Sequence, residues 1–249
     1  MDHDDGIFDE RVAATYDDDP MFDPAVVGPT VDLLAALADG GPALEFGIGT
    51  GRIALPLAAR GVPVSGIDLS RPMVASLRAK PGGDAIPVTI GDFASTDGGP
   101  EESFALVYLV YNTIMNLTSQ ADQAAAFRNA ARHLAPGGRF LIEVGIPDLR
   151  RLPPGERYVV FGASDDHIGF DEYDVANQGL VSHHLTRHDG ERFDYSSGPF
   201  RYVWPSELDL MATMAGLEPR DRWAGWTGEP FTSETRSHVS VWQKPAGGS

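Results

Sequence analysis

Cysteine is missing from this chain, and positive charge is scarce. The absence of cysteine excludes disulfide bonds, thiolate metal sites and catalysis by a nucleophilic cysteine. Lys and Arg number 19 against 36 Asp and Glu, which gives a formal net charge of −17 at pH 7. Because proteins bind nucleic acid largely by neutralising its phosphates with Lys and Arg, this charge argues against DNA or RNA as a partner.

Long apolar runs are missing too, so the sequence predicts no membrane span and no membrane partner. The first five residues, Met1 to Asp5, carry three aspartates and no basic residue, unlike a secretory signal. We therefore expect a cytoplasmic protein, either a monomer or a homodimer. Its 249 residues, 42% of them hydrophobic, suffice for one large α/β domain with an inserted subdomain.

A glycine-rich turn at residues 43–52, ALEFGIGTGR, organises the first half of the chain. A short apolar strand leads into Gly47, Gly49 and Gly51, and a helix follows. Glycines let a ligand approach the backbone, and the start of a helix offers free N–H groups. Arg52 stands where the dinucleotide fingerprint G-x-G-x-x-G requires its third glycine, which argues against NAD or FAD.

Strand and helix patterns alternate from Ala43 onwards, which predicts a mostly parallel sheet covered on both faces. An amphipathic helix around Val12 and Tyr16 and a second helix from Pro24 to about Asp39 precede it. The expected strands of the sheet are 43–46, 62–67, 86–90, the start of 104–115, and 139–144. Ser70 and Ser119 are expected to cap the helices that follow them, and Pro136-Gly-Gly138 is expected to end the second of these helices.

The pattern changes between residues 147 and 204 to extended segments with turn signals at 177–179 and 189–190. We interpret this stretch as an inserted antiparallel β subdomain that forms part of a substrate pocket or an oligomer interface. Residues 1–146 and 205–244 then make up the main domain. Ser206 is expected to cap a helix that Gly216 closes, and two last strands are expected within 217–223 and 237–242.

Polar residues follow three consecutive strands of the expected sheet. After the glycine turn, Asp68 follows the second strand, where a carboxylate can accept hydrogen bonds from both ribose hydroxyls of a nucleoside. Gly91 and Asp92 follow the third strand, where a carboxylate and a backbone amide can recognise adenine. Each aspartate alone is typical of a helix cap or turn, but all three signals together indicate a nucleoside site at the carboxyl edge of the sheet.

The motif Glu45-x-Gly47-x-Gly49-x-Gly51, together with Asp68 and Asp92, resembles the class I S-adenosylmethionine (SAM)-dependent methyltransferases. The resemblance covers roughly residues 8–145 and implies a Rossmann-like, doubly wound seven-stranded sheet whose last strand is antiparallel. It implies SAM as cofactor and S-adenosylhomocysteine as product. By the resemblance, Glu45 supports the methionine amino group, the three glycines line the methionyl moiety, Asp68 with Leu69 holds the ribose, and Asp92 and Phe93 contact adenine.

Two further positions have two interpretations each. Tyr16 is placed like a tyrosine that many relatives fold over the methionyl end of SAM, or it is a core aromatic. Arg52 pairs with the carboxylate of SAM or faces solvent. The chain is also weakly similar to aminosugar N,N-dimethyltransferases, but it has Met115-Asn116-Leu117 where those enzymes often have Gly-His-Leu.

Methyl transfer requires the acceptor atom in line with the methyl–sulfonium bond, and a general base helps a hydroxyl more than an amine. The candidate catalytic residues that face the methyl group are Asn112 and Asn116 after strand four, with Tyr111 beside them, and Glu143 after strand five. Only Glu143 is ionised, and each of these residues can instead make a hydrogen bond that stabilises its loop. In the insert, His167, Asp171, Glu172, Tyr173, His183 and His184 can face a substrate, although adjacent His183 and His184 point to opposite faces of a strand. We expect no metal.

The sequence therefore predicts a methyltransferase that acts on an O or N atom of a small-molecule metabolite. An alternative keeps bound SAM but uses it in non-methylating chemistry such as cyclisation. An oxidoreductase and a non-catalytic interaction protein are weaker alternatives. Nothing in residues 147–204 names the acceptor.

Overall fold

The computed structural model describes residues 8–18, 24–188 and 192–247. The predicted turn signal at 189–190 lies outside these residues. No helix within the described part combines the length and apolar character that crossing a bilayer requires.

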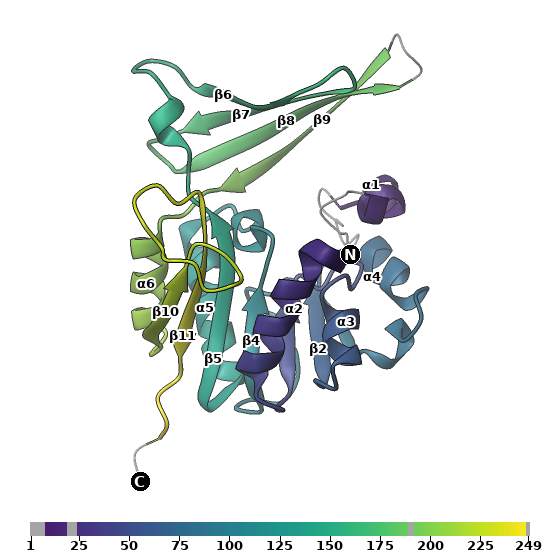
Figure 1. Cartoon of the computed structure of the whole chain (residues 1–249), viewed down its shortest axis with the longest axis vertical. Coiled ribbons are helices and arrows are strands. Elements are labelled where there is room, and N and C mark those ends of the chain that lie inside the picture. The colour runs from purple at the N-terminus through teal and green to yellow at the C-terminus, as the bar shows by residue number, and fades with distance from the viewer. Residues whose placement is uncertain (1–7, 19–23, 189–191, 248–249) are drawn as a thin grey trace.

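The main domain contains one seven-stranded sheet with the strand order β10-β11-β5-β4-β1-β2-β3 (Figure 1). Strands β1 to β5 are parallel, whereas β11 runs antiparallel to both β5 and β10. This confirms the predicted Rossmann-like sheet with an antiparallel last strand. The strands are β1 (Ala43–Phe46), β2 (Val64–Asp68), β3 (Val88–Ile90), β4 (Phe104–Leu109), β5 (Leu134–Gly145), β10 (Glu218–Trp223) and β11 (Ser237–Gln243).

Helices cover both faces of this sheet and bury its apolar residues. Val31, Leu57 and Leu77 bring α2, α3 and α4 into one hydrophobic cluster, while Phe127 and Leu208 bring α5 and α6 into another. The helices are α1 (Glu10–Thr15), α2 (Pro24–Ala38), α3 (Ala54–Ala59), α4 (Arg71–Arg78), α5 (Gln120–His133) and α6 (Pro205–Met214). Short 3-10 turns are η1 (Tyr16–Asp18), η3 (Gly83–Ala85), η4 (Thr113–Asn116) and η5 (Leu149–Arg151).

Ser70 and Ser119 cap α4 and α5 as predicted, each accepting a backbone N–H in the first turn. Two predicted boundaries are wrong. The helix α5 ends at His133 and β5 begins at Leu134, before Pro136. The helix α6 begins at Pro205, so Ser206 lies inside it and cannot cap it.

Asp209, three residues after Ser206, binds residues of other elements. Its carboxylate accepts hydrogen bonds from Arg222 at 2.7 Å and from the Trp242 indole at 2.9 Å. These bonds tie α6 to β10 and β11. The Asp209 carboxylate therefore binds distant residues and takes no part in a local helix cap. The helix begins with Pro205, whose backbone has no N–H group that a cap would have to satisfy.

Residues 147–204 form the predicted antiparallel insert, a separate four-stranded sheet above the carboxyl edge of the main sheet (Figure 1). Its strands, in spatial order, are β6 (Tyr158–Ala163), β7 (His167–Asp174), β8 (Gly179–His188) and β9 (Arg192–Arg201). Val159, Tyr173 and Leu180 pack with Tyr202 into a small core, and Met115 of η4 contacts it. The insert therefore rests on the loop that follows β4.

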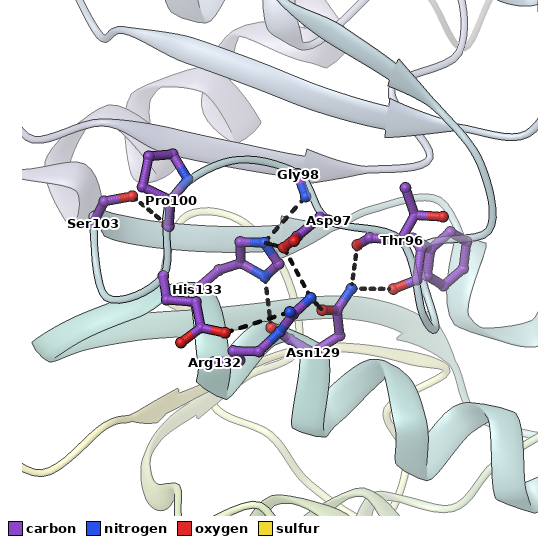
Figure 2. Close-up of polar contacts among 10 residues, drawn as sticks. Thr96, Asp97, Gly98, Pro100, Ser103, Asn129, Arg132 and His133 are labelled. Carbon is purple, nitrogen blue, oxygen red and sulfur yellow. Dashed lines mark hydrogen bonds and ion pairs between the residues drawn. The ribbon is translucent and has the colours of Figure 1, made fainter.

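At the opposite edge of the main sheet, the end of α5 is bound to the loop 93–103 by a polar cluster (Figure 2). The His133 ring is fully buried, with Nδ1 2.8 Å from the Asn129 carbonyl and Nε2 accepting the Gly98 amide at 3.0 Å. The Asn129 side chain donates to the carbonyls of Phe93 and Thr96. Every one of these buried polar groups has a partner, so the cluster holds the loop in place, from Phe93 beside the first cavity described below to Gly98.

Candidate functional site

The glycine turn after β1 has a left-handed backbone at all three glycines, with φ of 74°, 55° and 77° at Gly47, Gly49 and Gly51. A Cβ at Gly47 would lie 2.6 Å from Thr113 Cγ2, and one at Gly51 would lie 2.1 Å from Leu77 Cδ1. These two positions therefore exclude a side chain by packing as well as by conformation. Gly47 and Gly49 line a cavity, whereas Gly51 faces α4 outside the lining of that cavity.

Asp68, at the end of β2, joins the glycine turn to α4. One carboxylate oxygen accepts the Gly49 amide at 2.6 Å and the other accepts the Ser70 amide at 2.8 Å. Burial raises the pKa of Asp68, and these two hydrogen bonds lower it by a smaller amount. The side chain is 8% exposed and lines the same cavity as its exposed neighbour Leu69.

The residues after β3 complete this wall. Asp92 accepts the Ala94 amide at 2.8 Å, which closes a turn, and Phe93 stacks on Phe46 with ring centroids 5.7 Å apart. Both line the cavity. The structure thus brings together the strand-end residues that the sequence singled out.

This first cavity has a volume of about 290 Å³. The N-terminal segment closes one side of it through Phe8 and Tyr16, whose rings meet edge to face. Asp17 holds that segment on the glycine turn, because it accepts the Thr50 hydroxyl at 2.6 Å and pairs with Lys80 at 2.5 Å. Burial raises the pKa of Tyr16, so the ring is a neutral phenol at this wall.

Glu45 and Arg52 lie beside the first cavity and do not line it. Glu45 is 3% exposed and accepts the Tyr108 hydroxyl at 3.0 Å. Burial raises the pKa of Glu45 to about 8, and the Tyr108 hydrogen bond and the Arg52 charge oppose this shift. The Arg52 guanidinium stacks on the Tyr111 ring, 3.1 Å from its centroid, and also lowers the pKa values of Tyr16 and Glu143. Arg52 therefore does not face bulk solvent.

The loop after β4 makes a strained turn in which Tyr111 and Asn112 both have positive φ, 59° and 58°. The Glu143 carboxylate accepts the Tyr111 amide at 2.6 Å, and the Asn112 side chain accepts the Gly145 amide at 2.6 Å. Burial raises the pKa of Glu143, and hydrogen bonds from the Tyr111 and Asn112 amides and the charge of Arg52 oppose this shift. Two of the three predicted catalytic residues thus hold this turn.

A second cavity of about 340 Å³ lies between this loop and the insert. Asn112 and Met115 line it, whereas Thr113 and Asn116 line the first cavity. In β9, Pro199 lines the first cavity and its neighbour Phe200 lines the second. The loop and the end of β9 therefore form the wall between two adjacent cavities. The insert contributes Phe161, Asp171, Tyr173, Leu180, Ser182 and Phe200 to the second one.

The insert histidines divide between the two faces of their sheet, as the alternation along β8 predicts. His183 contacts the Tyr195 hydroxyl at 2.7 Å and stacks on Phe170. His184 instead contacts His167, with Nδ1 and Nε2 3.0 Å apart. Within the residues that the structure describes, no three His, Asp or Glu side chains gather closely enough to hold a metal ion.

Sequence reasoning missed several residues of the two cavities. Ser70, Met73 and Thr113 line the first cavity, and Ser182 lines the second. Ser182 pairs with Asp171 across β7 and β8, so it shares a face with a residue that the sequence did single out. The register of the hairpin, fixed by the turn at 177–179, was the available signal.

Comparisons with known proteins agree with this geometry. Residues 43–138 match the model of a family described as "Methyltransferase domain". The chain is 34% identical to the CcbJ methyltransferase from Streptomyces caelestis, whose solved structure superposes with a TM-score of 0.86 over 98% of this chain and 100% of that one. This chain belongs to the class I SAM-dependent methyltransferases.

More distant methyltransferases also match along most of their length. A cypemycin N-terminal methyltransferase from a Streptomyces species is 27% identical over 97% of this chain and 99% of its own. The SAM-bound structure of CalS10, an amino pentose methyltransferase from Micromonospora echinaspora, is 22% identical, with a TM-score of 0.65 and coverage of 88% and 89%. The latter identity supports the fold alone.

This enzyme uses SAM as its methyl donor, and the first cavity fits that cofactor. It has a glycine turn with room for a ligand, the Asp68 carboxylate at the end of β2, and the stacked ring of Phe93 beside Asp92. SAM supplies the methyl group.

Proposed function

We propose that this methyltransferase transfers a methyl group from SAM to an oxygen or nitrogen atom of a small-molecule metabolite held in the second cavity. The observation that carries the proposal is the shared wall between the two cavities, built by the loop after β4 and the end of β9. An acceptor at this wall lies beside the methyl end of a SAM molecule bound along the strand ends. Such placement aligns the reacting atoms and keeps water out.

The roles of individual residues follow from this placement. Asp68 with Leu69 holds the ribose, Asp92 and Phe93 contact adenine, and Gly47, Gly49 and Tyr16 surround the methionyl portion. Glu45, Gly51 and Arg52 support that portion from beside the cavity. Asn112, Asn116 and Glu143 position the acceptor and the turn that separates it from the donor.

In this arrangement the insert takes part in binding the acceptor. Residues 147–204 form an inserted subdomain that provides one wall of the acceptor cavity, and residues 1–146 and 205–244 form the SAM-binding domain. The relative named for N-terminal methylation favours nitrogen over oxygen as the acceptor atom. A cavity of about 340 Å³ suits a small molecule or the end of a larger one.

Calorimetry with SAM and S-adenosylhomocysteine tests the donor site. We expect micromolar binding that falls at least 100-fold in Asp68→Ala and stays unchanged in Asp84→Ala, an exposed aspartate in η3. A panel of amines, with alcohols of matched shape, is then incubated with enzyme and SAM carrying a labelled methyl group. Label transferred to a panel member, with S-adenosylhomocysteine formed in equal amount, supports the proposal. Absence of SAM binding by the unaltered enzyme contradicts it.

A further inference from the structure

Asp171 is the one carboxylate among the described residues that line the second cavity. It lies on the inward face of β7 together with Tyr173, whose ring belongs to the core beneath the insert. The other lining side chains from the insert are mostly apolar or aromatic. A carboxylate in such a setting is costly to bury unless a partner compensates its charge.

The hydrogen bonding of this carboxylate is incomplete. Ser182, its cross-strand neighbour on β8, places a hydroxyl donor on the same face, but the Oδ1 atom is buried and has no hydrogen-bond partner within the described part of the chain. Burial raises the pKa of Asp171, against smaller lowering effects of Ser182 and His183. An oxygen that is shielded from water and lacks a donor is suited to accept one from a cationic ligand in the cavity.

Ser182 also connects Asp171 to a chain of side chains that leads away from the cavity. The Ser182 hydroxyl lies 3.3 Å from His184 Nε2, and His184 Nδ1 lies 3.0 Å from His167 Nε2. His167 lies at the start of β7 and directly follows the exposed residues Asp165 and Asp166 in the sequence. Three hydrogen-bonded groups thus link the cavity to the surface.

The donors in this chain can all point in one direction. With Asp171 protonated, its carboxyl donates to Ser182, the Ser182 hydroxyl donates to His184 Nε2, and His184 Nδ1–H donates to His167 Nε2. A shift of each proton along its bond then carries one proton from Asp171 to His167, which releases a proton to solvent. Burial and the neighbouring rings of His167 and His183 lower the pKa of His184, which keeps this ring neutral and able to accept a proton.

We propose that the acceptor is an amine, that Asp171 binds its ammonium form and takes its proton, and that Ser182, His184 and His167 conduct that proton to solvent. This inference rests on the proposed function and adds to it the acceptor class and its binding residue. Asp171 is then a catalytic residue, whereas the other three are positioning residues.

The step balances as follows. An N–H bond of the ammonium group breaks, its proton moves to the Asp171 carboxylate, and the electron pair stays on nitrogen. The amine then attacks the methyl carbon of SAM, so that a C–N bond forms while the C–S bond breaks. The bonding pair of the C–S bond remains on sulfur, which gives S-adenosylhomocysteine and a methylated ammonium product.

The first test measures binding of a defined probe. Benzylammonium and benzyl alcohol have the same shape and suit an aromatic cavity, so only the charge differs. Calorimetry on the full chain loaded with S-adenosylhomocysteine should show tighter binding of benzylammonium. Asp171→Asn should weaken that binding at least tenfold and leave benzyl alcohol unchanged.

Asp174→Asn is the matched control, since Asp174 is an exposed residue of the same strand and its turn with Asn177 can be kept by an asparagine. It should bind both probes as the unaltered enzyme does. Equal benzylammonium binding by Asp171→Asn, or no preference for benzylammonium by an enzyme that does bind SAM, overturns the inference while the proposed function stands. Failure of the enzyme to bind SAM overturns the proposed function instead.

The second test addresses the chain of hydroxyl and imidazole groups. With the best amine of the labelled-methyl panel, Ser182→Ala should lower kcat about tenfold and leave KM within twofold. Ser182→Thr keeps the hydroxyl and suits a β-strand, so it should restore kcat. Equal kcat in the alanine and threonine variants contradicts the role of Ser182 in proton transfer.

Discussion

The fully buried histidine network of this enzyme and its partly buried one differ in whether every polar group has a protein partner. The His133 cluster lies at the edge of the sheet opposite the cavities, and each of its buried groups has a protein partner (Figure 2). The His184 chain begins at a cavity, where Asp171 Oδ1 has no partner among the described residues. The first network is complete without a ligand, and the second is not.

This difference in pairing predicts how much each network contributes to the free energy of unfolding. A fully paired network contributes to stability and loses it when one member is removed. A network that ends at an unpaired oxygen contributes little to stability, because that oxygen has lost its hydrogen bonds to water without gaining one from the protein. Variants that affect stability and variants that affect catalysis should therefore separate between the two networks.

Substitution of Glu45 should give the largest change in the free energy of unfolding. Glu45 is as deeply buried as His133 but lies beside the first cavity. Its pKa rises from 4.5 to about 8 on folding, so the folded enzyme keeps a proton there that the unfolded chain releases. Its contribution to the free energy of unfolding is fully present below pH 4.5 and is lost as the pH rises through 8. At about 1.4 kcal/mol per pKa unit, the loss amounts to at most about 5 kcal/mol.

Urea unfolding of the unaltered enzyme and of Glu45→Gln at pH 5, 7 and 9 measures this loss. The glutamine variant should show a flatter pH dependence by that amount. Glu218→Gln, an exposed residue of β10, serves as control and should keep the dependence of the unaltered enzyme. Parallel curves for the Glu45 variant and the unaltered enzyme would show that Glu45 is ionised throughout.

A matched pair of histidine substitutions tests the comparison directly. His133→Ala leaves the Gly98 amide and the Asn129 carbonyl without their partner and opens space in the core, so it should lower the free energy of unfolding by about 3 kcal/mol. Its kcat with the best amine should change less than twofold. His184→Ala should cost about 1 kcal/mol or less in stability and lower kcat about tenfold. The same stability loss in both variants would remove the distinction between the networks.

The first cavity could be predicted from the sequence because most of its predicted residues directly follow strands that the sequence pattern identifies. The glycine turn, Asp68 and Asp92 each follow a strand directly, and parallel strands bring their carboxyl ends to one edge. Family resemblance then supplied the cofactor. The contribution of Ser70 and Thr113 was not foreseen, because it depends on how neighbouring loops pack.

The second cavity could not be predicted in the same detail. Asp171 was a candidate among six insert residues, but only the register of β7 against β8 shows that it shares a face with Ser182 and His184. The wrong cap at Ser206 has a similar origin. Asp209 is claimed by Arg222 and Trp242 from distant strands, and no local pattern contains that information.

The smallest expected effect comes from the outer end of the His184 chain. A Cβ at Gly169 would lie 2.2 Å from Phe161 Cε2 and 2.9 Å from His167 Cε1, so Gly169→Ala must displace both rings. Phe161 is 46% exposed and can turn into solvent, which limits the stability loss to about 1 kcal/mol. Displacing His167 lengthens its contact with His184, so kcat should fall about threefold while SAM affinity stays constant. Gly162→Ala is the control, since its Cβ would meet only His167 Nδ1, at 3.9 Å. Identical kcat values for the two glycine variants would show that the proton path ends at His184 and does not include His167.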